Sequence, residues 1–381
     1  MHLSEEFKKN IKVLGRASSE EPYVLFWTGS RYEMNVKASS LSVKIRASYG
    51  NQEQWICVLV DGVRLIRMPL SNGENEIMIL RNRNREQEHN IRIVKDTPIM
   101  PGDGEHYIEL TDVLIDGELL PVSERKHKLL FIGDSITSGE GAIGARGEND
   151  WVSELFSATD NYAYMTAELV DADYQSLSQS GWGVCCGYDN DTRHVMPIAW
   201  DKVCALAYAD GPARPIRGAE KDYDFQAFVP DAIIINLGTN DANGVTMPPM
   251  KNPDTGVTFG MKLAEDGSLS KESAEAFLNS AVPFLSKIYE AYPKAKLYWT
   301  YGMLGTLLEP VIKEALSTFA KLHQTECPEY IALPEITDDT VGARFHPGLP
   351  CHRQTANRIA GVLNRYFQQL DGKEICSEKV K

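Results

Sequence analysis

The distribution of apolar and polar residues divides the chain into two parts with different periodicities. Between about residues 23 and 122, short segments alternate apolar and polar positions, as in Leu41-Ser-Val43-Lys-Ile45, which is typical of strands with one buried face. Asp61-Gly62, between two apolar runs, predicts a tight hairpin. Many short strands at this spacing predict a β-sandwich. The predicted strands cover 23–27, 32–36, 41–47, 55–60, 63–68, 76–80, 90–95 and 106–110.

From residue 128 onward, continuous apolar runs alternate with amphipathic segments. Runs such as 129–132 and 231–237 suit strands that are buried on both faces of a parallel sheet. Successive strand–helix units predict a parallel sheet with helices on both faces. We therefore expect a β-sandwich domain over residues 1–122 and an α/β domain over residues 123–381. The predicted helices cover 162–170, 272–292, 311–323 and 354–370, and further strands cover 174–177, 296–300 and 331–333.

Composition and charge limit the classes of protein to which the chain can belong and the partners it can bind. The 381 residues carry a formal net charge of −14, which makes nucleic acid and anionic membranes poor partners. The first fifteen residues lack the apolar core of a signal peptide, and no apolar stretch approaches the roughly 18 residues that span a bilayer. The seven cysteines are odd in number and scattered, so a reduced, cytoplasmic protein is expected. The oligomeric state, including a homo-oligomer, stays open.

Four polar segments follow predicted strands or precede the last predicted helix, and they hold the candidate chemistry. Gly133-Asp134-Ser135 ends the strand at 129–132, where a glycine permits a sharp turn. The others are 180–183, with Gly181, 238–241, with Asn240, and 346–348, with His346. Because the carboxyl ends of parallel strands meet at one edge of a sheet, these four segments can converge.

The residue types in these segments are those that acyl transfer needs. The hydroxyl of Ser135 is a weak nucleophile until a base removes its proton, and His346 is a base of suitable pKa. A tetrahedral oxyanion needs fixed donors, and the N–H groups of Ser135 and Gly181 and the Asn240 amide can supply them. We therefore predict Ser135 as nucleophile, His346 as base and these three residues as an oxyanion hole.

Each of these residues also has a purely structural interpretation. Ser135 or Asn240 could cap a helix, Gly181 could serve a turn, and a His-Pro pair can close a loop. Residues 139–144 match the glycine pattern of dinucleotide-binding turns, but they begin six residues after the strand end, so a flexible rim loop is the better interpretation. The set of four segments in order favours catalysis over coincidence.

The blocks GDSIT (133–137), SGWG (180–183), GTND (238–241) and HPG (346–348) resemble those of the SGNH (GDSL-type) hydrolases. This resemblance implies a three-layer α/β/α domain and serine ester hydrolysis without a metal or other cofactor. Upstream, Gly15-Arg16, the stretch WTGSRYE (27–33) and the Asp61-Gly62 turn are similar to the two-domain carbohydrate esterase family 2. That likeness implies removal of O-acetyl groups from plant polysaccharides or oligosaccharides of the xylan or mannan type.

The sequence departs from the family pattern at one position. Most SGNH hydrolases carry an aspartate three residues before the histidine, where this chain has Ala343. Several family 2 esterases are understood as Ser–His dyads whose histidine is held by a backbone carbonyl. Asp338 and Asp339 lie nearby in the sequence and could replace the missing acid. We expect a Ser135–His346 dyad, with the orienting group left open between a backbone carbonyl and these two aspartates.

Substrate contacts are predicted from aromatic residues, because sugar C–H faces stack on aromatic rings. Trp182, inside the glycine block, is the first candidate, and Trp151, Trp200 and Phe345 follow. The long irregular insertion at 185–228 is expected to govern substrate choice, with His194 in it as a surface histidine. A packing role is the alternative for each aromatic residue.

Three functions remain as hypotheses from the sequence. The leading one is an acetyl esterase that acts on acetylated oligosaccharides or polysaccharides through an acetyl-enzyme. The second is a lipid-type esterase or thioesterase of the same fold, which would accept long acyl chains. The third is a carbohydrate-binding protein that has lost catalysis, against which stand the intact Ser135, Gly181, Asn240 and His346.

Overall fold

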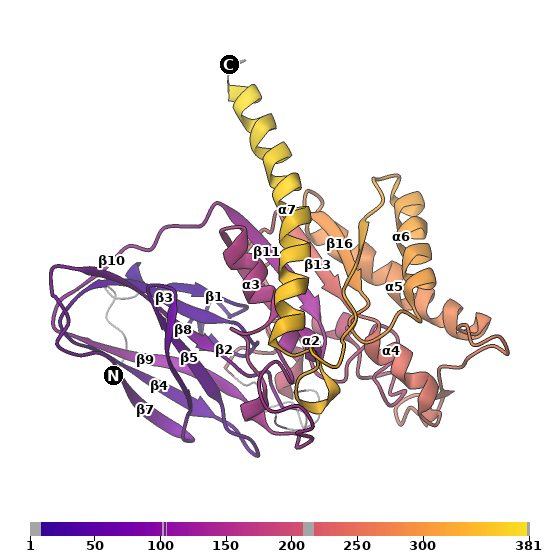
Figure 1. The fold of residues 1–381 in the computed structure, drawn as a ribbon, viewed down its shortest axis with the longest axis horizontal. Helices are drawn as coiled ribbons and strands as arrows, with labels where there is room; N and C mark the ends of the chain where they lie inside the picture. The colour runs from indigo at the N-terminus through magenta and orange to yellow at the C-terminus, as the bar shows by residue number, and fades with distance from the viewer. Residues whose placement is uncertain (1–8, 101–102, 104, 209–216, 379–381) are drawn as a thin grey trace.

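Two parts of different architecture lie side by side in the computed structural model, which describes residues 9–100, 103, 105–208 and 217–378 (Figure 1). The N-terminal part consists of antiparallel strands, and the C-terminal part is a parallel sheet covered by helices. The segment between Leu120 and His127 joins them. This arrangement confirms the expected fold class, an all-β sandwich followed by a three-layer α/β/α domain.

The N-terminal part is a sandwich of two antiparallel sheets. One has the order β1-β3-β8-β5-β6, with β10 also paired to β3, and the other has the order β2-β9-β4-β7. Alternate residues of the strands, such as Val43 and Ile45 of β4, are buried in a core that the two sheets share. The strands are β1 (Lys12–Leu14), β2 (Val24–Leu25), β3 (Arg31–Lys37), β4 (Leu41–Ser48), β5 (Trp55–Val60), β6 (Val63–Pro69), β7 (Gly73–Leu80), β8 (Glu88–Lys95), β9 (Tyr107–Ile115) and β10 (Glu118–Leu120).

The predicted strands of this part are confirmed, with two additions. Asp61 and Gly62 have φ angles of 52° and 78° and join the paired strands β5 and β6, as the hairpin prediction requires. The sequence did not reveal β1 and β10, which have three residues each and owe their conformation to pairing with β3. So short a strand has no detectable periodicity of its own.

The C-terminal part contains a five-stranded parallel sheet with the order β12-β11-β13-β16-β17. β11 lies inside the sheet between β12 and β13, and this position explains its continuous apolar run. The connections between successive strands of this sheet run through helices that pack on one face or the other. The strands are β11 (His127–Gly133), β12 (Ala172–Ser178), β13 (Ala232–Asn236), β16 (Lys296–Tyr301) and β17 (Glu329–Ala332), and a separate hairpin pairs β14 (Met250–Lys251) with β15 (Thr258–Phe259).

Helices cover both faces of the parallel sheet (Figure 1). Alternate residues of β11 point to opposite faces: Leu130 packs with α5 (Lys271–Ala291) and α6 (Glu309–His323), and Phe131 packs with α3 (Tyr162–Leu169) and α7 (Leu349–Glu378). α7 is longer at both ends than its predicted span. Two short helices, α2 (Ser135–Ser138) and α4 (Thr239–Asn243), follow β11 and β13, and the described chain has no helix that is long and apolar enough to cross a membrane.

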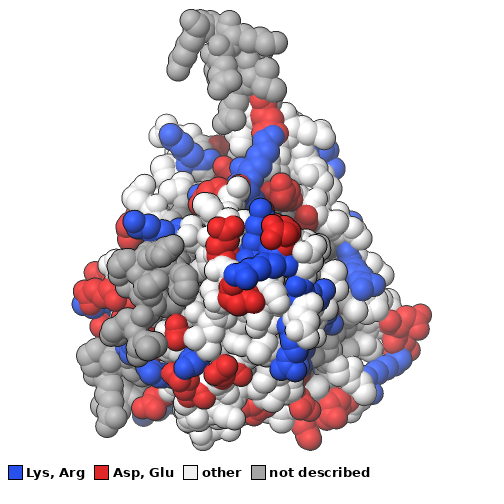
Figure 2. Space-filling model, turned by 90° about the vertical axis from the view of Figure 1, so that its left-hand side faces the viewer, with Lys and Arg blue, Asp and Glu red and all other residues white. Residues whose placement is uncertain are grey.

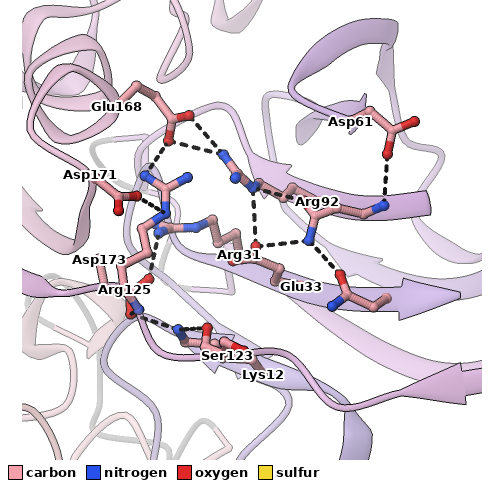
Figure 3. Close-up of polar contacts among 12 residues, drawn as sticks. Lys12, Arg31, Glu33, Asp61, Arg92, Ser123, Arg125, Glu168, Asp171 and Asp173 are labelled. Carbon is pink, nitrogen blue, oxygen red and sulfur yellow. Dashed lines mark hydrogen bonds and ion pairs between the residues drawn. The ribbon is translucent and has the colours of Figure 1, made fainter. Parts of the chain in front are cut away.

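A buried ionic cluster joins the two parts (Figure 3). The carboxylate of Asp173 in β12 has no exposed area, and its Oδ2 lies 2.6 Å from Lys12 Nζ and its Oδ1 lies 3.8 Å from Arg31 Nη2. Beside it, Glu168 of α3 lies 2.9 Å from Arg92 Nη1 and 2.8 Å from Arg125 Nη1. The β-sandwich therefore supplies three of the four cations, Lys12, Arg31 and Arg92, to carboxylates of β12 and α3, and the connecting segment supplies Arg125.

A second contact fixes the insertion at 185–228 against the N-terminal part. Trp27 Nε1 donates to the carbonyl of Val203 at 2.8 Å. Arg16 Nη1 donates to the carbonyls of Trp200 and Lys202 at 2.5 and 3.0 Å. Residues 209–216 of the insertion lie outside the described residues. The Gly15-Arg16 and Trp27–Glu33 stretches thus contribute residues that hold this insertion and the sheet edge.

The surface on the side of the N-terminal part carries charges of both signs. Figure 2 shows Lys and Arg side chains interspersed with Asp and Glu side chains over this face. Several pairs at the surface explain the mixture, such as Arg46 with Glu109 and Arg217 with Glu21.

We predict that Asp173→Asn destabilises the protein by about 3 kcal/mol, because Lys12 and Arg31 would then be left with less counter-charge in a buried contact. The measurement is the free energy of unfolding in urea. Asp222→Asn is the matched control, since Asp222 pairs with Lys202 at 2.7 Å but its side chain is 85% exposed. It should change the free energy by less than about 1 kcal/mol. Equal losses in the two variants would contradict a special role for the buried cluster.

Candidate active site

The turn after β11 presents Ser135 at the start of α2. Asp134, not Ser135, is the N-cap, because its Oδ1 accepts from the Ile136 N–H at 3.0 Å. Gly133 is required here, since a Cβ at this position would lie 1.9 Å from Thr137 Oγ1. The structural alternative for Ser135 is therefore wrong, and its hydroxyl is left available for another partner.

That partner is His346, on the loop that precedes α7. His346 Nε2 lies 2.9 Å from Ser135 Oγ, and His346 Nδ1 lies 2.9 Å from the carbonyl oxygen of Arg344. A carbonyl can only accept, so Nδ1 carries the proton and Nε2 is the free base that accepts from the serine hydroxyl. This is the arrangement that activates a serine nucleophile.

Neither candidate aspartate reaches the histidine. Asp338 pairs with Arg146 at 2.6 Å and its side chain is 90% exposed, and Asp339 is also exposed. The geometry therefore places a backbone carbonyl, the one of Arg344, at the position where a triad aspartate would stand.

Gly181 and Asn240 reach the same pocket from the ends of β12 and β13. Gly181 has a φ of 78°, and a Cβ there would lie 3.1 Å from the ring of Tyr188. Asn240 Nδ2 donates to the Trp182 carbonyl at 2.9 Å and lies 3.3 Å from Asp134 Oδ2. The Trp182 contact fixes the orientation of the amide, so Ser135, Gly181 and Asn240 are brought together as the sequence predicted.

Two buried carboxyl groups brace these turns. Asp241 accepts from the N–H groups of Val184 and Cys185 at 2.7 to 3.0 Å and thereby ties the Asn240 turn to the loop after Gly181. Burial raises the pKa of Asp241, and it raises the pKa of Asp134 to about 7, helped by the nearby charges of Asp241 and Glu140.

Ser135 lies in a pocket of about 450 Å³ whose wall combines aromatic and aliphatic side chains with polar and charged ones. Trp182 lines it, although its side chain is almost entirely buried, and its ring stacks on His194 at 5.7 Å between centroids. Tyr188 is half exposed at the pocket, and Trp151 lines another part of the wall. His194, which the sequence led us to expect at the surface, has a side chain that is 33% exposed, and its ring forms part of this wall.

Two predicted substrate contacts lie elsewhere. Trp200 is 2% exposed, outside the pocket, and packs under the guanidinium of Arg16 and against Phe225, so the prediction that it contacts substrate is wrong. Phe345 is 73% exposed, and it is absent from the pocket lining although both of its neighbours line it. The residues 139–144, expected to form a flexible rim loop, include the buried Glu140 and pack beneath the His346 loop.

Sequence reasoning missed Glu140, Tyr188 and Arg344 as pocket residues. Tyr188 and His194 share the insertion with many other polar residues, and no local pattern distinguishes them. Glu140 and Arg344 flank the serine and histidine blocks, so their proximity to the two motifs was the one available signal.

A group of potential metal ligands lies behind the glycine block. Among the described residues, Cys185, Cys186 and Asp241 are buried and place their ligand atoms within 4.8 Å of one another. The carboxylate of Asp241 already accepts backbone N–H groups, and burial together with the Cys186 thiol raises the pKa of the Cys185 thiol, which disfavours the thiolate that a metal needs. These residues suit a structural contact better than a metal centre.

Comparisons with known proteins agree with this architecture. Residues 13–122 match the family model described as carbohydrate esterase 2 N-terminal. An acetyl xylan esterase from the rumen bacterium Butyrivibrio proteoclasticus is 35% identical, with a TM-score of 0.90 over 94% of this chain and 96% of its own. A family two carbohydrate esterase from Clostridium thermocellum, solved with cellohexaose, is 21% identical with a TM-score of 0.75 over 94% and 99%, a likeness that shows the fold alone.

The chain matches only part of the length of its curated relatives. An acetylxylan esterase / glucomannan deacetylase of Cellvibrio japonicus is 24% identical over 61% of this chain and 61% of its own length. A cellulase/esterase of Acetivibrio thermocellus is 24% identical over 88% of this chain and 37% of its own length. The chain thus spans less than two thirds of either curated relative. The 35% identity to the Butyrivibrio enzyme extends over nearly all of both chains, and with the matching N-terminal family model it establishes that this chain belongs to carbohydrate esterase family 2.

Proposed function

We propose that the protein is a serine esterase that removes O-acetyl groups from acetylated plant oligosaccharides or polysaccharides, of the xylan or mannan type. The observation that carries the proposal is the 2.9 Å contact of Ser135 Oγ with His346 Nε2, in a pocket that Gly181 and Asn240 also line. The relatives described as acetylxylan esterases support the substrate class. The reaction class is hydrolysis of a carboxylic ester.

Acylation begins with attack of Ser135 Oγ on the acetyl carbonyl carbon, while His346 Nε2 takes the serine proton. The carbonyl oxygen becomes negatively charged and accepts hydrogen bonds from the N–H groups of Ser135 and Gly181 and from Asn240 Nδ2. Asn240 keeps its bond to the Trp182 carbonyl and gives up its longer, 3.3 Å bond to Asp134 for this purpose. His346 then gives the proton to the sugar oxygen as the C–O bond breaks. The products of this half-reaction are the free sugar hydroxyl and an acetyl ester on Ser135.

Deacylation repeats these steps with water in place of the serine. His346 Nε2 takes a proton from water, and the hydroxide oxygen attacks the acetyl carbonyl. The same three donors bind the second oxyanion. His346 returns the proton to Ser135 Oγ as acetic acid leaves, which then ionises to acetate in water, and the resting enzyme is restored.

The compartment and the cofactor requirement belong to the proposal as well. No disulfide bond joins the six cysteines whose side chains are described, five of which are buried, and this supports a reducing, cytoplasmic environment. Every step above uses groups of this chain and water. We therefore propose activity without a metal or organic cofactor on soluble acetylated sugars.

The proposed function predicts acetate release from acetylated xylan or mannan oligosaccharides and a preference for acetyl over long acyl groups. The measurement is kcat/KM for C2, C4 and C8 aryl esters beside acetate release from the oligosaccharides, with and without prior EDTA dialysis. We expect C2 to be the best aryl ester and EDTA to have no effect. A preference for C8 would favour the lipid-type esterase, and an EDTA loss reversed by zinc would contradict the serine mechanism.

The dyad predicts that Ser135→Ala and His346→Ala each lower kcat by at least about 10³-fold, because the nucleophile and its base act as a unit. Asp338→Asn and Asp339→Asn should each change kcat by less than tenfold, or about 1.4 kcal/mol. The measurement is steady-state hydrolysis of an aryl acetate, with circular dichroism to confirm folding. A thousandfold loss in either asparagine variant would instead identify a displaced triad acid.

The pocket wall predicts that Tyr188→Ala weakens binding of the sugar more than it affects chemistry. Loss of an aromatic contact of about 1 kcal/mol should raise KM for an acetylated oligosaccharide about fivefold. The kcat/KM for a small aryl acetate should stay within about twofold of the wild-type value. Phe345→Ala is the control, as an exposed aromatic residue outside the pocket lining, and should change neither. Equal losses of both activities in Tyr188→Ala would assign that residue a structural role.

A further inference from the structure

Glu140 is a buried carboxylate beside the reacting nitrogen of His346. Its side chain is 3% exposed, and its Oε1 lies 3.9 Å from His346 Nε2. The same oxygen accepts from Arg344 Nε at 2.8 Å. Glu140 thus contacts the residue whose carbonyl orients His346 and lies close to the nitrogen that carries the proton during the reaction.

The backbone on both sides of this contact is fixed by close packing. Glu140 N–H donates to the Ser135 carbonyl at 3.0 Å, so its position is tied to the nucleophile turn. Gly141, with a φ of 68°, follows it, and a Cβ there would lie 2.3 Å from the Ala343 carbonyl oxygen and 2.7 Å from His346 Cβ. The absence of a side chain at this position lets the histidine loop lie directly on the segment that carries Glu140.

Arg344 is held by both its backbone and its side chain. Its N–H donates to the Glu148 carbonyl at 2.7 Å, and its Nη1 donates to the Asn149 carbonyl at 2.8 Å. Its φ of 54° lies in the left-handed region, which a non-glycine residue adopts only when its surroundings enforce it. Glu140 completes these contacts through Arg344 Nε, so the carbonyl that accepts from His346 Nδ1 is fixed.

We propose that Glu140 is a positioning and charge-balancing residue for His346, and that it supplies the negative charge that this dyad lacks at the position of a triad aspartate. The proposal rests on the proposed function of Ser135 and His346. A carbonyl oxygen orients the imidazole but carries no full charge to stabilise the imidazolium that forms in each step. The carboxylate of Glu140 supplies that charge from the Nε2 side and offsets the guanidinium of Arg344, which would otherwise oppose the imidazolium.

The other ionisable groups near His346 do not take this role. His352 is fully buried, and burial lowers its pKa to about 3, with a contribution from His346, so it is neutral at the pH of the reaction. Asp134 is bonded to the Ile136 N–H and directed toward Asn240. Among the described residues, the ion pair of His346 is therefore the one with Glu140, which in turn pairs with the oppositely charged Arg344.

The test measures the titration midpoint of His346 by NMR of the labelled imidazole, with His346→Asn used to assign the signal. Glu140→Gln leaves the Arg344 charge uncompensated and should lower the midpoint by about one pH unit. Arg344→Met keeps the backbone carbonyl but leaves the Glu140 charge alone, and should raise the midpoint by a similar amount. The double variant should return to within about 0.3 units of the wild-type value.

A purely structural role predicts a different pattern, because each of the three variants loses the same Glu140–Arg344 ion pair. The proposal would be overturned if the titration midpoint of His346 were the same in the two single variants. It would also be overturned if the midpoint in the double variant were shifted as far as it is in Glu140→Gln. If Glu140→Gln does not fold, Arg344→Met decides alone, and an unchanged or lowered midpoint there overturns it. Asp338→Asn is the matched control, since it removes an exposed carboxylate from the segment that precedes the same loop, and it should leave the midpoint unchanged.

Activity provides the second readout. The acid limb of kcat/KM for an aryl acetate should move with the midpoint, down in Glu140→Gln and up in Arg344→Met, and the plateau kcat of Glu140→Gln should fall about tenfold. A wild-type protein without esterase activity would refute the proposed function while leaving the titration test of Glu140 intact. An active wild-type enzyme with an unshifted acid limb in both variants would refute the role of Glu140 alone.

Discussion

The hydrogen bond from His346 Nδ1 to the Arg344 carbonyl is the interaction on which the candidate chemistry depends. It fixes the tautomer that leaves Nε2 free to accept from Ser135. To turn that carbonyl toward the ring, Arg344 and Phe345 adopt φ angles of 54° and 56°. Each such residue costs about 1 to 3 kcal/mol, and the bonds of Arg344 to Glu140, Glu148 and Asn149 offset this strain. The exposed Phe345 ring is a consequence of that backbone geometry.

The β-sandwich also contributes to the pocket that holds Ser135. Ile99 and Met100, which belong to the N-terminal part, line the pocket beside Ser135. Leu206, in the insertion that Arg16 and Trp27 hold, also lines it. Because the pocket wall comes from both parts, the buried ionic cluster at the interface and the contacts of the insertion position the substrate site as well as stabilise the fold.

The sequence was sufficient for the fold and for the convergence of the four motif residues, because both follow from local rules. A buried strand that ends in Gly133 predicts a turn at the sheet edge, and parallel strands bring Gly181 and Asn240 to the same edge. It was insufficient for Trp200, because an aromatic residue in an irregular insertion has no periodicity that shows which face is buried. The carbonyl acceptor of His346 was open for a related reason, since backbone acceptors leave no trace in residue identity and depend on φ angles that the sequence does not state.

Burial of Asp134 reduces the negative charge at the turn that carries the nucleophile Ser135. A full negative charge next to Ser135 would oppose the oxyanion that forms at the same donors. Because burial raises the pKa of Asp134 to about 7, the group carries less negative charge at neutral pH than an exposed aspartate would. Asp241, whose pKa is also raised, accepts backbone N–H groups, so its charge is directed into the loop after Gly181. The carboxyl groups of Asp134 and Asp241 can therefore hold both turns of the oxyanion hole in place without two full negative charges beside the transition state.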